Sequence, residues 1–160
     1  MLVVKQDPSV PYRRVLVPVD FSEHSLTALR FARALAPTAE ICLFHALDAP
    51  VEGILRNAGV SEASIAAYHA QDEQEARTRM SRLIAEAGSL AASALPIFKR
   101  GDPRVLISDT AQSSDADLIV IGKHGRSRLA EYFMGGTTRL TLARAQRDIA
   151  VVPEARPNTG

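Results

Sequence analysis

The sequence predicts a doubly wound α/β fold, with five mostly parallel strands in one sheet and helices on both of its faces. Short apolar runs rich in β-branched residues, typical of buried parallel strands, alternate with segments whose apolar residues recur at helical spacing. The first two runs lie about twenty residues apart, the length of one strand–helix–strand crossover. We expect one domain over residues 13–153, between tails at 1–12 and 154–160.

The first two predicted strands, at residues 14–19 and 40–46, enclose a helix. Ser22 is placed to cap this helix at its start, and Pro37 follows its last turn. The next segment, 48–61, contains a proline and two glycines. We expect an irregular loop there, which serves either as a lid over a pocket or as an exposed partner site.

A long, mostly polar helix is expected from Ser61, its cap, to about residue 89, with Gly88 at its end. Its charged segment 72–79 predicts a solvated helix face with local ion pairs. A third strand follows at 92–98, and the pair Asp102 and Pro103 opens a helix that reaches about residue 112. The last predicted elements are a strand at 118–121, a helix at 138–145 and a strand at 149–152.

The stretch 116–138 carries the main functional signal, because its strand ends in a glycine-rich basic loop. Glycines permit close backbone approach, and a helix N-terminus offers free N–H groups, so this layout suits a phosphate chain. By spacing alone, simple turns and solvated cations explain the loop equally well, and neither the P-loop nor the dinucleotide fingerprint occurs. The glycines and cations are Gly122, Lys123, Gly125, Arg126, Arg128, Gly135, Gly136 and Arg139.

The spacing Gly122, two residues, Gly125, nine residues, Gly135 resembles the nucleotide-binding signature of the universal stress protein family. The segments 15–25 (VLVPVDFSEHS), 41–48 (ICLFHALD) and 148–153 (DIAVVP) are similar to that family in the same order. The resemblance implies a Rossmann-like fold and a stress-response role. The departure is Gly136, where the ATP-binding branch usually has serine or threonine. A lost hydroxyl–phosphate bond weakens affinity by about ten- to a hundredfold.

Carried over by position, the resemblance implies a site for ATP, with or without Mg²⁺. Val19 and Asp20 would border the nucleoside, and the glycines would approach ribose and phosphates through their backbone. The sequence motif also brings His124 into this loop, as a phosphate contact or as a solvated residue. The full expected site comprises Pro18, Val19, Asp20, Ala46, Ile121, Gly122, Lys123, His124, Gly125, Arg126, Gly135, Gly136, Thr137 and Thr138.

Three residues within or near these strands also have ordinary structural interpretations. Asp20 is suited to capping the following helix. His45 alternates with Ile41 and Leu43 and is expected to be packed and hydrogen-bonded rather than catalytic. Cys42 lies within an apolar run and is expected to be an inert core residue.

Composition limits the possible partners. With 19 basic and 18 acidic residues, the net charge of +1 gives no field that favours nucleic acid or a membrane surface as a partner. A single cysteine excludes an intramolecular disulfide and fits a reducing compartment, so we expect a cytoplasmic protein. No apolar run is long enough to span a membrane.

The expected function is a nucleotide-dependent regulator rather than an enzyme, because no acidic pair for a metal and no catalytic motif accompanies the loop. Slow ATP hydrolysis or self-phosphorylation at Ser127 or Thr137 remains open. The alternative is an interaction protein of the same family that binds no nucleotide. If the strand at 149–152 lies at the sheet edge, its backbone would pair with another copy, which predicts a homodimer.

Overall fold

The computed structural model describes residues 2–3, 11–47, 50–122 and 147–152. Within them, one six-stranded sheet has the order β1-β6-β5-β2-β3-β4. Its strands are β1 (Leu2–Val3), β2 (Arg14–Pro18), β3 (Glu40–Leu47), β4 (Leu95–Arg100), β5 (Leu118–Gly122) and β6 (Asp148–Val152). The five strands from β2 to β6 are parallel to one another. This confirms the predicted doubly wound sheet.

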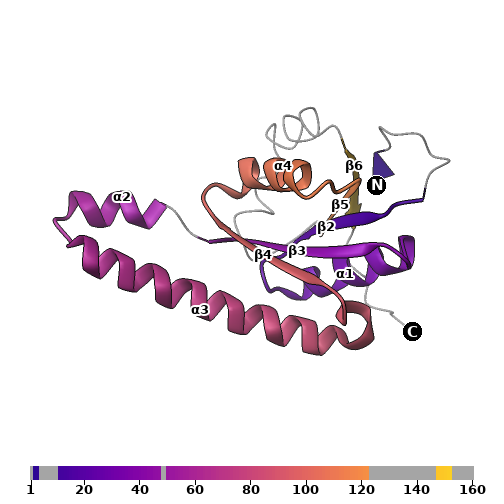
Figure 1. The fold of residues 1–160 in the computed structure, drawn as a ribbon, viewed down its shortest axis with the longest axis horizontal. Helices are drawn as coiled ribbons and strands as arrows, with labels where there is room; N and C mark the ends of the chain where they lie inside the picture. The colour runs from indigo at the N-terminus through magenta and orange to yellow at the C-terminus, as the bar shows by residue number, and fades with distance from the viewer. Residues whose placement is uncertain (1, 4–10, 48–49, 123–146, 153–160) are drawn as a thin grey trace, which may run out of the picture.

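Helices cover both faces of the sheet, with α4 on one side and α1 and α3 on the other (Figure 1). The helical elements are α1 (Glu23–Leu35), α2 (Pro50–Asn57), α3 (Glu62–Ala87), the short 3₁₀ helix η1 (Gly88–Ala91) and α4 (Pro103–Ser113). One hydrophobic core joins α1 and α3 to the sheet through residues such as Leu29 and Met80. A second core lies under α4 and includes Ile107. Period-two alternation on the buried strands supplies both cores.

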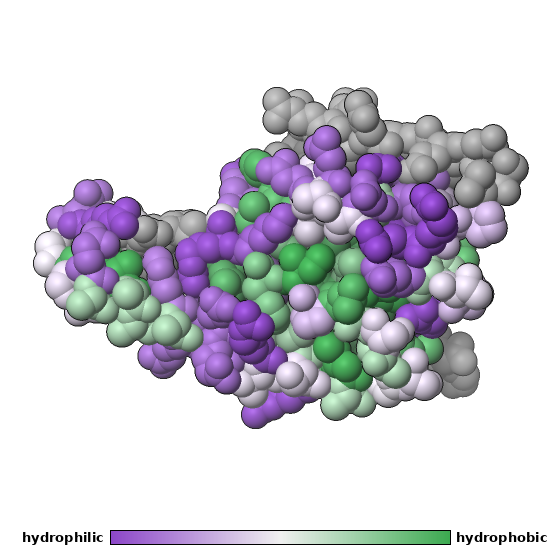
Figure 2. All heavy atoms as spheres, viewed as in Figure 1, coloured by the Kyte–Doolittle hydropathy of each residue, from purple (hydrophilic) through white to green (hydrophobic). Residues whose placement is uncertain are grey.

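The predicted helix ends are largely confirmed. The hydroxyl of Ser61 accepts a hydrogen bond from the backbone N–H of Ser64 at 3.2 Å, and Gly88 ends α3 with φ of 58°. The carboxylate of Asp102 accepts from the backbone N–H of Arg104 at 2.9 Å. Hydrophilic side chains follow the exposed length of α3, as its sequence predicts (Figure 2). The predicted helix at 138–145 lies outside the described residues.

The segment 48–61 was expected to be a loop, and this expectation is wrong for residues 50–57, which form α2. Proline is tolerated in the first turn of a helix, where its missing N–H has no partner to lose, so Pro50 starts the helix instead of breaking it. Gly59, with φ of 76°, then ends the helical stretch. The helix α2 packs against α3.

The strand β4 begins at Leu95, three residues later than the predicted start. The preceding residues instead continue the turn of η1, where the N–H of Ala94 donates to the carbonyl of Ala91 at 2.9 Å. The predicted start of this strand was too early, because the alanines that precede Leu95 favour a helical turn over a strand.

The strand β6 does not form the edge of the sheet along its whole length, contrary to expectation. Leu2 and Val3 form β1, which pairs antiparallel with β6 in the register Leu2↔Ala150 and Val3↔Ile149. Residues 1–12 were expected to be a flexible tail, and the pairing of Leu2 and Val3 corrects this expectation for these two residues. Tyr12 is also anchored, because its hydroxyl donates to the Asp148 carboxylate at 2.8 Å.

Candidate functional site

The candidate site lies where the strand order reverses, at the carboxyl ends of β2, β3 and β5. From β2, the chain continues into β3 and β4 on one side, and β5 and β6 lie on the other. Helices on opposite faces leave a crevice at such a reversal, and ligands of open α/β sheets bind there. The structure brings Asp20, Ala46 and Gly122 to this edge of the sheet, as the sequence predicted.

Asp20 is fixed at the start of α1 by its own side chain. Its Oδ1 accepts hydrogen bonds from the backbone N–H of Ser22 at 3.0 Å and from the hydroxyls of Ser22 and Ser25 at 2.5 and 2.8 Å. The Ser25 hydroxyl in turn accepts from the backbone N–H of Asp20 at 3.0 Å. The expected side-chain cap from Ser22 is absent. Asp20 instead ties Ser22 and Ser25 together at the start of α1 and presents a carboxylate of defined orientation at the site.

The ring of Phe21, the residue after Asp20, contacts an aromatic ring from β3 and a cation from α3. Its ring centroid lies 4.3 Å from that of His45 on β3. On α3, the Arg79 guanidinium carbon lies 4.7 Å from the same ring centroid. The sequence analysis did not identify Phe21 or Arg79; the position of Phe21 directly after Asp20 was the only available signal, and nothing local marked Arg79.

His45 is packed and hydrogen-bonded, as predicted. Its Nδ1 lies 2.9 Å from the carbonyl oxygen of Val19. Burial lowers the pKa of His45 below its usual range, since desolvation disfavours the imidazolium; the hydrogen bond to Val19 opposes that shift. A neutral imidazole that donates to Val19 fits this geometry, and it holds the residue before Asp20 in place.

The backbone at Gly122 passes close to the first turn of α1 and leaves little room for a side chain. A Cβ at this position would lie 3.1 Å from the backbone oxygen of His24 and 3.2 Å from its Cβ, both in the first turn of α1. Close approach of β5 to α1 thus depends on the missing side chain. The same helix turn carries the Asp20 hydrogen bonds, so Gly122 and Asp20 belong to one packed unit.

The other expected site residues divide into two groups. Pro18, Val19 and Ile121 are buried, and the last two belong to the hydrophobic cores on opposite faces. Ala46 is half-buried and packs with the core under α4. Outside the described residues lie Lys123, His124, Gly125, Arg126, Gly135, Gly136, Thr137 and Thr138.

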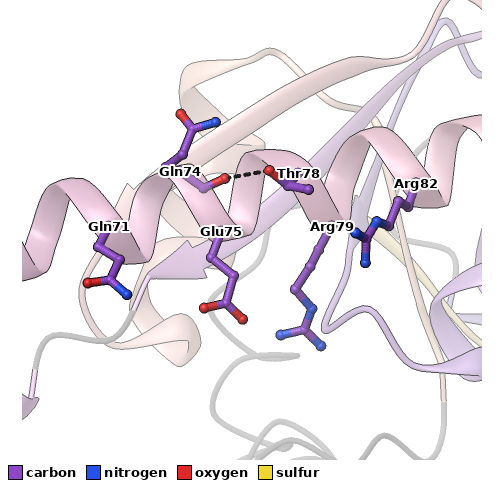
Figure 3. A pocket seen from close by; sticks show the side chains of 6 residues that line it. All are labelled: Gln71, Gln74, Glu75, Thr78, Arg79 and Arg82. Atoms are coloured by element: carbon purple, nitrogen blue, oxygen red, sulfur yellow. Dashed lines mark hydrogen bonds between the residues drawn. The ribbon is translucent and has the colours of Figure 1, made fainter.

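A hollow of about 510 Å³ lies along α3 (Figure 3). Its polar and charged lining consists of Gln71, Gln74, Glu75, Thr78, Arg79 and Arg82. Arg79 belongs both to this hollow and to the ring stack on Phe21. In the described part of the chain, no group of histidine, cysteine and acidic residues could hold a metal ion, and no helix is long and apolar enough to cross a membrane.

These features define a Rossmann-like α/β protein with its candidate site at the topological switch point of the sheet. The model of the universal stress protein family matches residues 11–153. The chain therefore belongs to the universal stress protein family, as its sequence motifs indicated.

Individual relatives extend over almost the whole chain. Universal stress protein MJ0577 of Methanocaldococcus jannaschii is 24% identical over 156 residues, which cover 90% of this chain and 96% of that protein. Universal stress protein Sll1388 of Synechocystis is 25% identical over 150 residues, covering 88% and 97%. The solved structure of MJ0577 matches with a TM-score of 0.72 at 25% identity, covering 92% of this chain and all of that one.

A crystal structure of a universal stress protein in complex with cAMP matches with a TM-score of 0.54 at 26% identity, covering 89% of this chain and 98% of that one. The fold resemblance therefore includes a relative with a bound adenine nucleotide.

Proposed function

We propose that this chain is a stress-response regulator that binds an adenine nucleotide, with ATP as the expected ligand, at the carboxyl ends of β2, β3 and β5. The observation that carries the proposal is the Asp20 carboxylate, held by three hydrogen bonds at the switch point of the sheet. A fixed carboxylate is a strong acceptor for ribose hydroxyls or for an adenine amino group. A relative of the same fold was crystallised with cAMP, which supports an adenine ligand.

The glycine loop would hold the phosphates. Gly122, Gly125 and Gly135 stand at the spacing of the family's nucleotide signature. Backbone N–H groups at a helix start bind phosphate without side chains. Glycine at position 136 would therefore weaken ATP binding by about ten- to a hundredfold rather than abolish it, unless Thr137 or Thr138 supplies the missing hydroxyl.

The proposed role is binding and not catalysis. Phosphoryl transfer needs acidic residues for a metal, a positioned nucleophile and a charge stabiliser. Among the described residues of the candidate site, the carboxylate is that of Asp20, whose Oδ1 is already engaged by two serines. We expect the protein to act in the cytoplasm, where ATP is available and Cys42 stays reduced. The alternative function is a dimeric interaction protein that binds no nucleotide.

The first test measures bound nucleotide. The purified protein is denatured, released small molecules are identified by mass spectrometry, and the emptied protein is titrated with ATP, with and without Mg²⁺, by calorimetry. Micromolar affinity or co-purified adenine nucleotide supports the proposal. No adenine nucleotide and no binding at millimolar ATP would overturn it and leave the alternative.

A substitution at Asp20 tests whether this residue lies at the nucleotide site. Asp20→Asn keeps an oxygen acceptor for Ser22 and Ser25 but removes the charge, so the helix start should survive while ATP affinity falls about tenfold or more. Asp109→Asn is the matched control, because Asp109 is exposed on α4. Equal affinity in both variants would place the ligand elsewhere.

We also propose a homodimer that uses β6, as the sequence analysis expected from residues 149–152. Since β1 pairs with Ile149 and Ala150, such a dimer would have to use the carboxyl end of β6, include β1 in the interface or displace it.

A further inference from the structure

Phe21 has a backbone conformation that is unusual for a bulky residue. Its φ is 63°, in the left-handed region that favours glycine. In the described part of the chain, Asp115 is the other non-glycine residue with a positive φ. A phenylalanine keeps this conformation only where its surroundings stabilise it. The turn from Asp20 to Ser22 therefore depends on what holds the Phe21 side chain.

Two groups contact the Phe21 ring, one from β3 and one from α3. The His45 ring, whose Nδ1 is bonded to Val19, stacks at 4.3 Å with an interplanar angle of 38°. The Arg79 guanidinium contributes a cation–π contact at 4.7 Å. Three consecutive residues after β2 are thus fixed. His45 of β3 holds Val19, His45 and Arg79 hold Phe21, and Ser22 and Ser25 at the start of α1 hold Asp20.

Arg79 reaches this turn from the exposed side of α3. Figure 3 shows its side chain extending from the helix beside that of Arg82. A second cation–π contact joins α3 to the sheet, because the Arg77 guanidinium carbon lies 5.0 Å from the ring centroid of Phe98 on β4. The ring of Phe98 lies 6.5 Å from that of His45. The polar helix α3 is therefore connected to the turn at Asp20 by a continuous series of ring contacts.

We propose that Phe21 and Arg79 are positioning residues for Asp20, so that the affinity of the site for a nucleotide depends on contacts made by α3. This inference rests on the proposed function. Neither residue contacts the ligand in this scheme. Loss of the Arg79 contact leaves the Phe21 ring held by His45 alone, so Phe21 leaves its left-handed conformation part of the time and the Asp20 carboxylate loses its fixed direction.

The test compares Arg79→Met and Arg79→Lys with the matched control Arg82→Met. Arg82 lines the same hollow on α3, and the described part of the chain gives it no hydrogen bond, ion pair or ring contact. A cation–π contact at an exposed site is worth about 0.5–1 kcal/mol, so Arg79→Met should weaken ATP binding about two- to fivefold. Arg79→Lys should restore most of the affinity, and Arg82→Met should leave it unchanged.

The variant Phe21→Gly removes the ring while the backbone can keep its positive φ, so it tests the ring contacts apart from the backbone conformation. Glycine adopts a positive φ without strain, but the Phe21 ring also packs against the core of α1 and α3, so the variant should stay folded with a lower unfolding temperature. Its ATP affinity should nevertheless fall, because the ring contacts with Arg79 and His45 are gone. Unchanged affinity in both Phe21→Gly and Arg79→Met would overturn the proposal.

A second measurement does not depend on nucleotide binding. Backbone amide shifts of residues 20–25 and the titration of His45 are followed by NMR in the ligand-free protein. Arg79→Met should move the amide shifts of Asp20 and Ser22 and raise the pKa of His45, because the charge of Arg79 lowers it while Asp72 and Asp20 raise it. Amide shifts unchanged from wild type would overturn the positioning role. If wild type binds no nucleotide but these shifts move, the proposed function fails while the positioning of Asp20 stands.

Discussion

Replacing Gly122 with alanine should destabilise the fold even though alanine is the smallest possible addition. The new Cβ would lie 3.1 Å from the His24 oxygen and 3.2 Å from the His24 Cβ. These are backbone and near-backbone atoms, so relief requires α1 to move by a few tenths of an ångström. Overpacking of this kind costs about 1–3 kcal/mol. The smaller entropy of the unfolded alanine chain offsets about 0.4–1 kcal/mol, which leaves a net loss of about 1.3 kcal/mol at the middle of the two ranges and about 0–2.6 kcal/mol at their limits.

Gly53→Ala is the matched control. Gly53 lies inside α2, and a Cβ there would meet nothing within 4 Å. Alanine in a helix interior should raise the free energy of unfolding by about 0.5–1 kcal/mol. The two substitutions are chemically identical and should shift stability in opposite directions.

Urea unfolding followed by circular dichroism measures both variants, with an unchanged m-value as the check that unfolding stays two-state. For a domain of this size, 1 kcal/mol corresponds to about 2–4 °C in Tm, so calorimetry gives an independent value. The reasoning is refuted if Gly122→Ala is as stable as wild type or more stable. That result would mean that β5 does not need close approach to the first turn of α1.

Two further predictions concern Tyr12 and β6. Burial, together with the hydrogen bond to Asp148, raises the pKa of Tyr12 to about 12 from an ordinary value of 10.0. The stabilisation that Tyr12 gives is therefore complete below pH 10 and is lost as pH rises toward 12. In urea unfolding, the free energy of unfolding of Tyr12→Phe should fall less over this pH range than that of wild type, and an equal fall in both proteins would contradict the prediction. Val151→Lys on β6 should convert the proposed dimer to a monomer, as measured by light scattering. The control Val105→Lys, at a side chain 54% exposed on α4, should leave the dimer intact, and a dimer in both variants would argue for another interface.

The sequence predicted elements whose signals are local. Apolar β-branched runs marked the five parallel strands, and the caps at Ser61, Gly88 and Asp102 marked helix ends. Elements whose formation depends on contacts with the rest of the chain were predicted less accurately. Pro50 and Gly59 indicate a loop when taken alone, yet Pro50 starts α2 and Gly59 follows its end, and this helix contacts α3. The strand β1 has only two residues and exists through its pairing with β6.

The same distinction applies to the candidate site. Asp20 and Gly122 were found because they follow strands, and this position is visible in the sequence. Arg79 was not found, because its contact with Phe21 joins residues far apart in the chain and no local pattern encodes it. Sequence spacing on α3 indicated only a solvated face. Contacts across elements are decided by the tertiary arrangement, which places Arg77 over the Phe98 ring and Arg79 over the Phe21 ring. Arg82, on the same helix, lines the hollow without a ring contact in the described part of the chain.

Asp20 and Gly122 each have a structural role that does not need a ligand. The carboxylate closes the first turn of α1, and the glycine allows that turn to pack on β5. A family member that lost nucleotide binding would still be under pressure to keep both residues for its fold. Asp20→Asn separates this structural role from the proposed ligand role, because the amide keeps the acceptor for Ser22 and Ser25 and removes only the charge that a ligand would use. A loss of ATP affinity with an unchanged fold therefore supports the nucleotide-binding regulator.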